Sequence, residues 1–128
     1  MEILKLRTES GFSLIELLTV VLIIGVLAFI AIPQFSAQRK RGFEATLKAD
    51  LRNAASAEEA YFAQNRVYKA GPLPNVALAG YNKSADISGI DAVVGTNTFL
   101  LTATHSNCAG ISWTYTNTSG VPAGPSCP

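Results

Sequence analysis

The sequence is poor in the side chains that most often carry catalysis or hold metals. It contains one histidine, His105, and two cysteines, Cys108 and Cys127, in 128 residues. A structural zinc site uses four nitrogen or sulfur ligands, and these three side chains fall short of such a set. No Ser-His-Asp or Cys-His pattern surrounds His105, which we expect on the surface of a turn, and no phosphate-binding P-loop is present. We therefore expect no metal, no cofactor and no enzymatic activity.

Formal charge is also scarce, and it is unevenly placed. The chain has a net charge of +1, and no charged residue occurs from Leu17 to Gln38. A DNA-binding surface normally shows a pronounced basic face. Beyond residue 65 the only cations are Arg66, Lys69 and Lys83. This distribution argues against a nucleic-acid partner.

The uncharged stretch is an apolar run with a carboxylate at its head. Leu, Ile, Val, Ala and Phe dominate it, and it is long enough to cross a hydrocarbon core of about 30 Å. A carboxylate in a membrane segment is costly, so Glu16 calls for a partner. A cut between Gly11 and Phe12 would create an α-amine four residues before Glu16, on the same helix face. The two charges could then neutralise each other within one chain or between neighbouring chains.

Two simpler explanations of the apolar run compete with this one. A secretory signal peptide has a basic start and an apolar core of roughly 7 to 15 residues, but this run is longer and begins with a carboxylate. A single-span membrane anchor explains the length of the run. It leaves Glu16 and the Gly11-Phe12 junction without a cause.

The stretch of Gly11, Phe12 and Glu16, continued by Thr19–Leu27 and Ala31–Phe35, resembles the N terminus of type IV prepilins and of the related pseudopilins of secretion systems. In that family a membrane peptidase removes a short leader that ends in glycine, and the new N-terminal residue is methylated. The resemblance implies cleavage between Gly11 and Phe12 and N-methylation of Phe12. It also implies that Glu16 pairs with the Phe12 amine of an adjacent subunit during assembly.

The resemblance also implies where the protein resides before and after assembly. The precursor would reside in the inner membrane, meet the prepilin peptidase and the pilus assembly machinery, and enter an extracellular helical filament of identical subunits. The alternatives are a minor pilin or a type II secretion pseudopilin and, less favoured, a pilin that binds DNA during uptake. Adhesion, motility and secretion are all compatible with the sequence.

Gly25 and Pro33 are the weak points of the predicted N-terminal helix. Proline removes a backbone hydrogen bond, and glycine costs about 1 kcal/mol relative to alanine in a helix interior. In assembled pili of the family the helix unwinds between the matching glycine and proline. The resemblance therefore implies melting boundaries at Gly25 and Pro33, whereas the residues alone allow a gentle kink.

We expect an α+β chain with the pilin fold, in which a long N-terminal helix packs its second half against a small antiparallel sheet. Residues 1–11 would be the removed leader, 12–38 the transmembrane and assembly half of the helix, and 39–128 the head. An amphipathic pattern continues the helix to about Gln64. The Gly- and Pro-rich region 65–97 predicts a connecting loop, and β-branched and aromatic residues predict strands at about 98–104 and 111–116. The strands should bury residues from the set Phe99, Leu101, Ile111, Trp113 and Tyr115 against Leu47, Leu51 and Phe62.

Cys108 and Cys127 have 18 residues between them. In a domain exported to an oxidising compartment such a pair favours a disulfide, which adds about 3 kcal/mol in the chain-entropy model. The arrangement is similar to the C-terminal disulfide-bounded loop of many type IV pilins. Two free thiols and a shared metal site are the alternatives.

Overall fold

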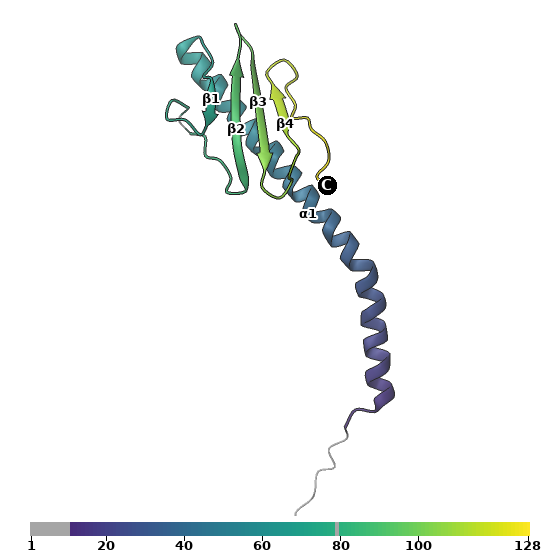
Figure 1. The fold of residues 1–128 in the computed structure, drawn as a ribbon. Helices are drawn as coiled ribbons and strands as arrows, with labels where there is room; N and C mark the ends of the chain where they lie inside the picture. Colours follow the sequence, from purple (N-terminus) through teal and green to yellow (C-terminus); the bar gives the residue numbers. More distant parts are fainter. Residues whose placement is uncertain (1–10, 79) are drawn as a thin grey trace, which may run out of the picture. The chain divides into compact units, whose positions relative to one another are not determined.

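The computed structural model describes residues 11–78 and 80–128, which form one long helix followed by a sheet (Figure 1). The predicted α+β pilin fold is confirmed. The chain divides into two compact units, one reaching Ser36 and the other starting at Ala37. The elements are α1 (Leu14–Asn65), β1 (Gly71–Leu73), β2 (Ile87–Val94), β3 (Phe99–His105) and β4 (Trp113–Thr116).

In its described part, from residue 11 on, the first unit consists mainly of the start of α1 and forms no core of its own. Every large apolar side chain from Leu14 to Phe35 exposes more than half of its surface. An 18-residue window of α1 has a mean hydropathy of 2.9 with none of it buried, which is long and apolar enough to cross a membrane. The helix continues through Gly25 and Pro33. Such a surface requires lipid or other helices to cover it.

In the second unit, α1 supplies one side of the core. Its apolar residues recur every three or four positions, and this spacing places them on one helix face. Leu47, Leu51 and Ala54 are 0% exposed. Two carboxyl groups, those of Asp50 and Glu58, are buried on the same helix.

The other side of the core is a four-stranded antiparallel sheet in the simple order β1-β2-β3-β4 (Figure 1). Ala92 pairs with Leu101, which in turn pairs with Tyr115. Alternate residues of β3 point inward, as a strand requires, so that Phe99, Leu101 and Ala103 are all buried.

The region 65–97 is not the connecting loop that its composition predicted. It contains β1 and the eight residues of β2, the longest strand of the sheet. Gly89 lies inside β2, where the register shifts between Ile87 and Gly89, as at a β-bulge. Pro72, which lacks an N–H, lies in the edge strand β1. Glycine and proline therefore mark a bulge and a sheet edge here rather than loop.

Most of the predicted core residues lie at the helix–sheet interface, whereas Phe62 is only partly buried and lies outside the core cluster. Phe99, Leu101 and Trp113 are buried, with Leu47 and Leu51 from α1 in the same cluster. Ile111 and Tyr115 are only partly buried and pack against that cluster. Of the alternate residues of β4, Trp113 therefore contributes most to the core.

Candidate functional site

Glu16 forms a capping box with Ser13 at the start of α1. The Ser13 N–H donates to Glu16 Oε2 at 2.8 Å, and the Glu16 N–H donates to Ser13 Oγ at 3.3 Å. This reciprocal arrangement satisfies backbone N–H groups that a helix start leaves without partners. The Ser-x-x-Glu spacing was the sequence signal for it. We predicted Glu16 only as the partner of an amine, and the capping of α1 is a second role that we had not predicted.

Gly11 and Phe12 precede the helix and are open to solvent. Phe12 is 94% exposed, and a Cβ built on Gly11 meets nothing within 4 Å. Because Glu16 binds the N–H of Ser13, its carboxylate already faces the backbone one residue beyond Phe12. A cut after Gly11 would therefore create an α-amine near the Glu16 carboxylate. Both groups would lie at the N-terminal end of the helix, where the helix dipole is positive.

The interval between Gly25 and Pro33 is helical throughout. A Cβ built on Gly25 meets nothing within 4 Å, so packing within this chain does not require glycine there. A shallow apolar groove runs beside it, lined in part by Val21, Val26 and Phe29. Any need for glycine at this position comes from helix flexibility or from contact with another molecule.

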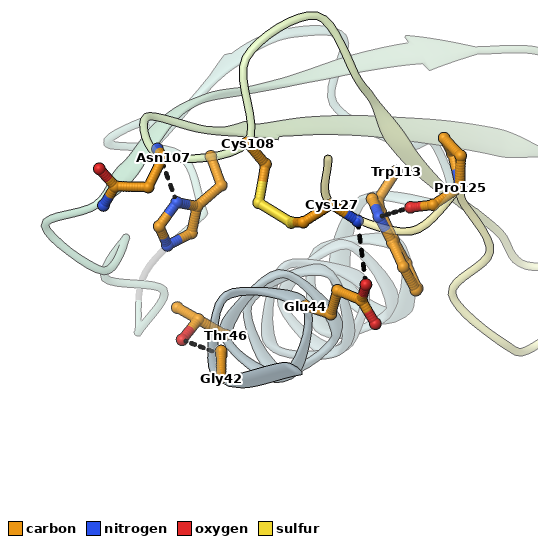
Figure 2. The surroundings of a disulfide bond; sticks show 9 residues. Gly42, Glu44, Thr46, Asn107, Cys108, Trp113, Pro125 and Cys127 are labelled. Carbon is orange, nitrogen blue, oxygen red and sulfur yellow. Dashed lines mark hydrogen bonds between the residues drawn. A yellow bond between two sulfur atoms is a disulfide. The ribbon is translucent and has the colours of Figure 1, made fainter. Parts of the chain in front are cut away.

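The C-terminal residues are tied to the helix and to the sheet. Cys108 and Cys127 form a disulfide with a Cα–Cα distance of 5.2 Å (Figure 2). The Cys127 N–H donates to Glu44 Oε1 on α1 at 3.0 Å. The disulfide that the resemblance implied is thus present, and Glu44 is a partner that the sequence did not reveal. We call residues 121–128 the C-terminal strap.

The strap also covers the free edge of β4. Thr114 and Ala123 exchange two backbone hydrogen bonds of 2.8 Å each. Trp113 Nε1 donates to Pro125 O at 3.0 Å, as Figure 2 shows. A Cβ built on Gly124 would lie 2.5 Å from Cγ of the Trp113 ring, so only glycine fits there without a shift. An edge strand covered in this way is protected from pairing with another chain.

Asp50 holds the segment between β1 and β2 against α1. Its Oδ2 accepts the Ser84 N–H and its Oδ1 accepts the Ser84 hydroxyl, both at 2.8 Å. The Tyr81 hydroxyl lies 3.5 Å from Oδ2. Burial, reinforced by the Asp50 charge, raises the pKa of Tyr81 well above its ordinary value. A buried carboxylate with several donors is a structural anchor.

His105 is buried, and our expectation of a surface position was wrong. It is 3% exposed because it is the last inward-facing residue of β3. Its Nδ1 accepts the Asn107 N–H at 3.1 Å, and its ring centroid lies 4.8 Å from that of Phe43. Across residues 11–78 and 80–128, no three His, Cys, Asp or Glu side chains gather closely enough to hold a metal ion.

Known proteins share both the N-terminal segment and the head. Residues 6–32 match a family model described as the prokaryotic N-terminal methylation motif. The chain is 32% identical over 108 residues to the type IV wide pilus major component PilA4 of Thermus thermophilus, covering 84% of this chain and 81% of that protein. A match of 108 residues is too long for either unit alone, so it includes parts of both.

Two further relatives match a shorter stretch. The type II secretion system core protein G of Pseudomonas aeruginosa is 36% identical over 62 residues, 48% of this chain and 44% of that protein. The type IV major pilin protein PilA of Myxococcus xanthus is 41% identical over 60 residues, 47% of this chain and 27% of that protein. The chain belongs to the type IV pilin family, because it has the methylation motif, the helix-and-sheet fold and the extended match to PilA4.

Proposed function

We propose that this pilin is a structural subunit that adds along the shaft of a type IV pilus and polymerises through the first half of α1. The observation that carries the proposal is the exposed apolar surface of the first half of α1. Each large apolar side chain from Leu14 to Phe35 leaves more than half of its surface uncovered by the residues that the structure describes. Lipid would cover this surface in the inner-membrane precursor, and sister helices would cover it in the extracellular filament.

Processing would come first. In our proposal the prepilin peptidase removes residues 1–11 by cutting between Gly11 and Phe12, and the new α-amine of Phe12 is then methylated. Both residues precede the helix, and Phe12 is exposed, which supports their access to an enzyme. The mature chain would consist of an assembly segment, residues 12–38, and a head, residues 39–128.

Pairing of charges would then guide assembly. In the precursor Glu16 is held by Ser13. After cleavage the α-amine of Phe12 would compete for that carboxylate, first within the chain and then from an adjacent subunit. A charge left alone among apolar helices costs several kcal/mol, so correct docking would be favoured over misaligned docking. The hydrogen bond from the Ser13 N–H would stabilise the Glu16 carboxylate until the partner arrives.

Gly25 and Pro33 would allow the helix to adapt in the filament. The interval is helical in the single chain, and we propose that it unwinds as subunits leave the bilayer. The absence of any contact that fixes Gly25 within the described chain supports this role. Glycine and proline both lower the cost of opening a helix.

A pseudopilin of a type II secretion system is the second candidate, favoured by the match to core protein G. That match covers 48% of this chain, whereas the match to PilA4 covers 84%. We therefore place the pilus subunit first. Mass analysis of sheared surface filaments separates the two, because a shaft subunit would be abundant in them.

Blocking the cleavage site tests the proposed processing. In Gly11→Val the β-branched side chain would replace the smallest residue before the scissile bond, and we expect an uncut precursor that stays in the membrane. Ala31→Val, a comparable change inside the apolar run, should be cut normally. Intact mass after membrane extraction reports both results. A mature chain beginning at Phe12 in Gly11→Val would contradict the proposed site.

A further inference from the structure

Glu58 is a carboxyl group that filament assembly does not use and that the head buries completely. It is 0% exposed, on the stretch of α1 that also buries Leu51, Ala54 and Ala55. The hydrophobic core on the sheet side includes Leu73 of β1 and Ile90 and Ala92 of β2. An ionisable group in such surroundings needs partners or a proton.

The structure supplies a single partner for the Glu58 carboxyl group. The Lys69 N–H donates to Oε2 at 2.9 Å. Oε1 is buried and has no hydrogen-bond partner among the residues that the structure describes. An ionised carboxylate offers about four acceptor sites and is costly to bury with one donor. A neutral carboxylic acid fits this site better, because it carries no net charge out of water.

The charged and titratable groups around Glu58 come from α1 and from the segment that follows it. Burial is the largest influence on the pKa of Glu58 and raises it. The hydrogen bond from the Lys69 N–H lowers this pKa, the negative charge of Glu59 raises it and the positive charge of Lys69 lowers it, and the net shift is upward. Burial likewise raises the pKa of Tyr68 above its ordinary value, so its phenol stays protonated while carboxyl groups titrate. Asp91 of β2 is exposed, between neighbours that point to the core.

We propose that Glu58 is a proton-operated latch that holds residues 66–70 on α1 as the neutral acid and loosens them when it ionises. Loss of the proton to solvent leaves a buried negative charge with one N–H donor. Water can stabilise that charge only by reaching Oε1, which requires a covering segment to move. Residues 66–70 belong to neither α1 nor the sheet. A backbone hydrogen bond from the Arg66 N–H to Phe62 O joins them to α1, and their displacement breaks no strand pairing.

The latch would act on the contacts of Tyr68, which lies in the same segment. The Tyr68 ring stacks on Phe62 at 4.5 Å and meets Phe99 of β3 edge-on at 4.8 Å. Its hydroxyl donates to Glu59 Oε1 at 3.1 Å and accepts from Asn117 Nδ2 at 3.4 Å. Release of residues 66–70 would therefore loosen the end of α1, β3 and the turn after β4 together.

A carboxyl titration tests the protonation state directly. In the full chain in detergent, with 13C-labelled glutamate, the Glu58 carboxyl is assigned through its own side-chain carbons, so that no variant is needed. We expect it to titrate at higher pH than an ordinary glutamate carboxyl group. Titration at or below the ordinary glutamate pKa would overturn the proposal.

Hydrogen exchange tests the mechanical part of the latch. In the wild type, protection of the Lys69 amide should fall across the Glu58 titration by more than base catalysis explains. Glu58→Gln, which cannot ionise, should abolish this extra loss, and Asp91→Asn, an exposed control on β2, should retain it. Unchanged pH dependence in Glu58→Gln would overturn the proposal. In the same window the folded head binds a proton that the unfolded chain has released, so the unfolding equilibrium constant should rise with pH by up to about tenfold per pH unit.

Discussion

Replacement of Asp50 by alanine should destabilise the head more than replacement of either of its hydrogen-bond partners, Ser84 and Tyr81. Asp50 is 3% exposed and accepts two hydrogen bonds of 2.8 Å from Ser84. Asp50→Ala removes both acceptors and leaves the Ser84 N–H and hydroxyl without partners. The segment between β1 and β2 then loses its anchor on α1.

The magnitude follows from the number and type of these bonds. A hydrogen bond to a charged group contributes about 1.5–3 kcal/mol, so the two short bonds together contribute roughly 3–6 kcal/mol. Removing a buried carboxylate also relieves its desolvation cost. We therefore expect a loss of about 3 kcal/mol in the free energy of unfolding, which lowers the melting temperature of a domain of this size by roughly 12–24 °C.

Thermal unfolding of the full chain in detergent provides the assay, followed by the fluorescence of Trp113, the single tryptophan. Ser84→Ala removes one of the two short bonds and should cost about 1.5 kcal/mol, the low end of the range for a bond to a charged group, because Ser84 is only half-buried. Tyr81→Phe should cost less than 1 kcal/mol, because its hydroxyl lies 3.5 Å from the carboxylate. An Asp50→Ala variant within 1 kcal/mol of wild type, or no more affected than Tyr81→Phe, would refute the reasoning.

The other two stability predictions concern backbone geometry. Arg66 directly follows the last residue of α1, donates its N–H to Phe62 O at 2.8 Å and has a φ of 59°, the left-handed conformation that glycine adopts most easily. Arg66→Gly should therefore stabilise the head by roughly 0.5–1 kcal/mol in denaturant titration, whereas Arg66→Ala should not. Gly124→Ala would place its Cβ against the Trp113 ring and should destabilise by about 1–3 kcal/mol. Gly89→Ala, where a Cβ meets nothing within 4 Å, is the matched control, and equal effects at the two glycines would contradict the packing argument.

The helix was predictable because its pattern is local. Apolar residues recur every three or four positions and carry α1 to Asn65, within a residue of the predicted end. The same kind of argument failed for β2, where the bulge at Gly89 interrupts the alternation that identifies a strand. It failed for β1 because three residues that include Pro72 carry almost no strand signal. A high content of glycine and proline predicts a departure from regular structure, but it does not distinguish a β-bulge or an edge strand from a loop.

The same distinction applies to the candidate sites. The Ser13–Glu16 capping box is local, and the Ser-x-x-Glu spacing in the sequence is sufficient to predict it. The bond between Asp50 and Ser84 joins residues 34 positions apart, and that between Glu44 and Cys127 joins residues 83 positions apart. No local pattern predicts such pairs, since they arise only when the sheet packs on α1. The surface position predicted for His105 was wrong for the same reason, because the exposure of this side chain depends on how β3 packs in the core.

The role of Glu16 in assembly is the central claim, and a single comparison of filament yield tests it most directly. Glu16→Ala should still be inserted in the membrane and cut after Gly11, yet sheared filaments should contain at least about tenfold less subunit, because an uncompensated Phe12 amine costs several kcal/mol in the apolar bundle. Thr19→Val is the matched control, since the Thr19 hydroxyl bonds only to carbonyl groups of its own helix. Its filament yield should equal that of wild type. A wild-type yield of filaments from Glu16→Ala would contradict the account.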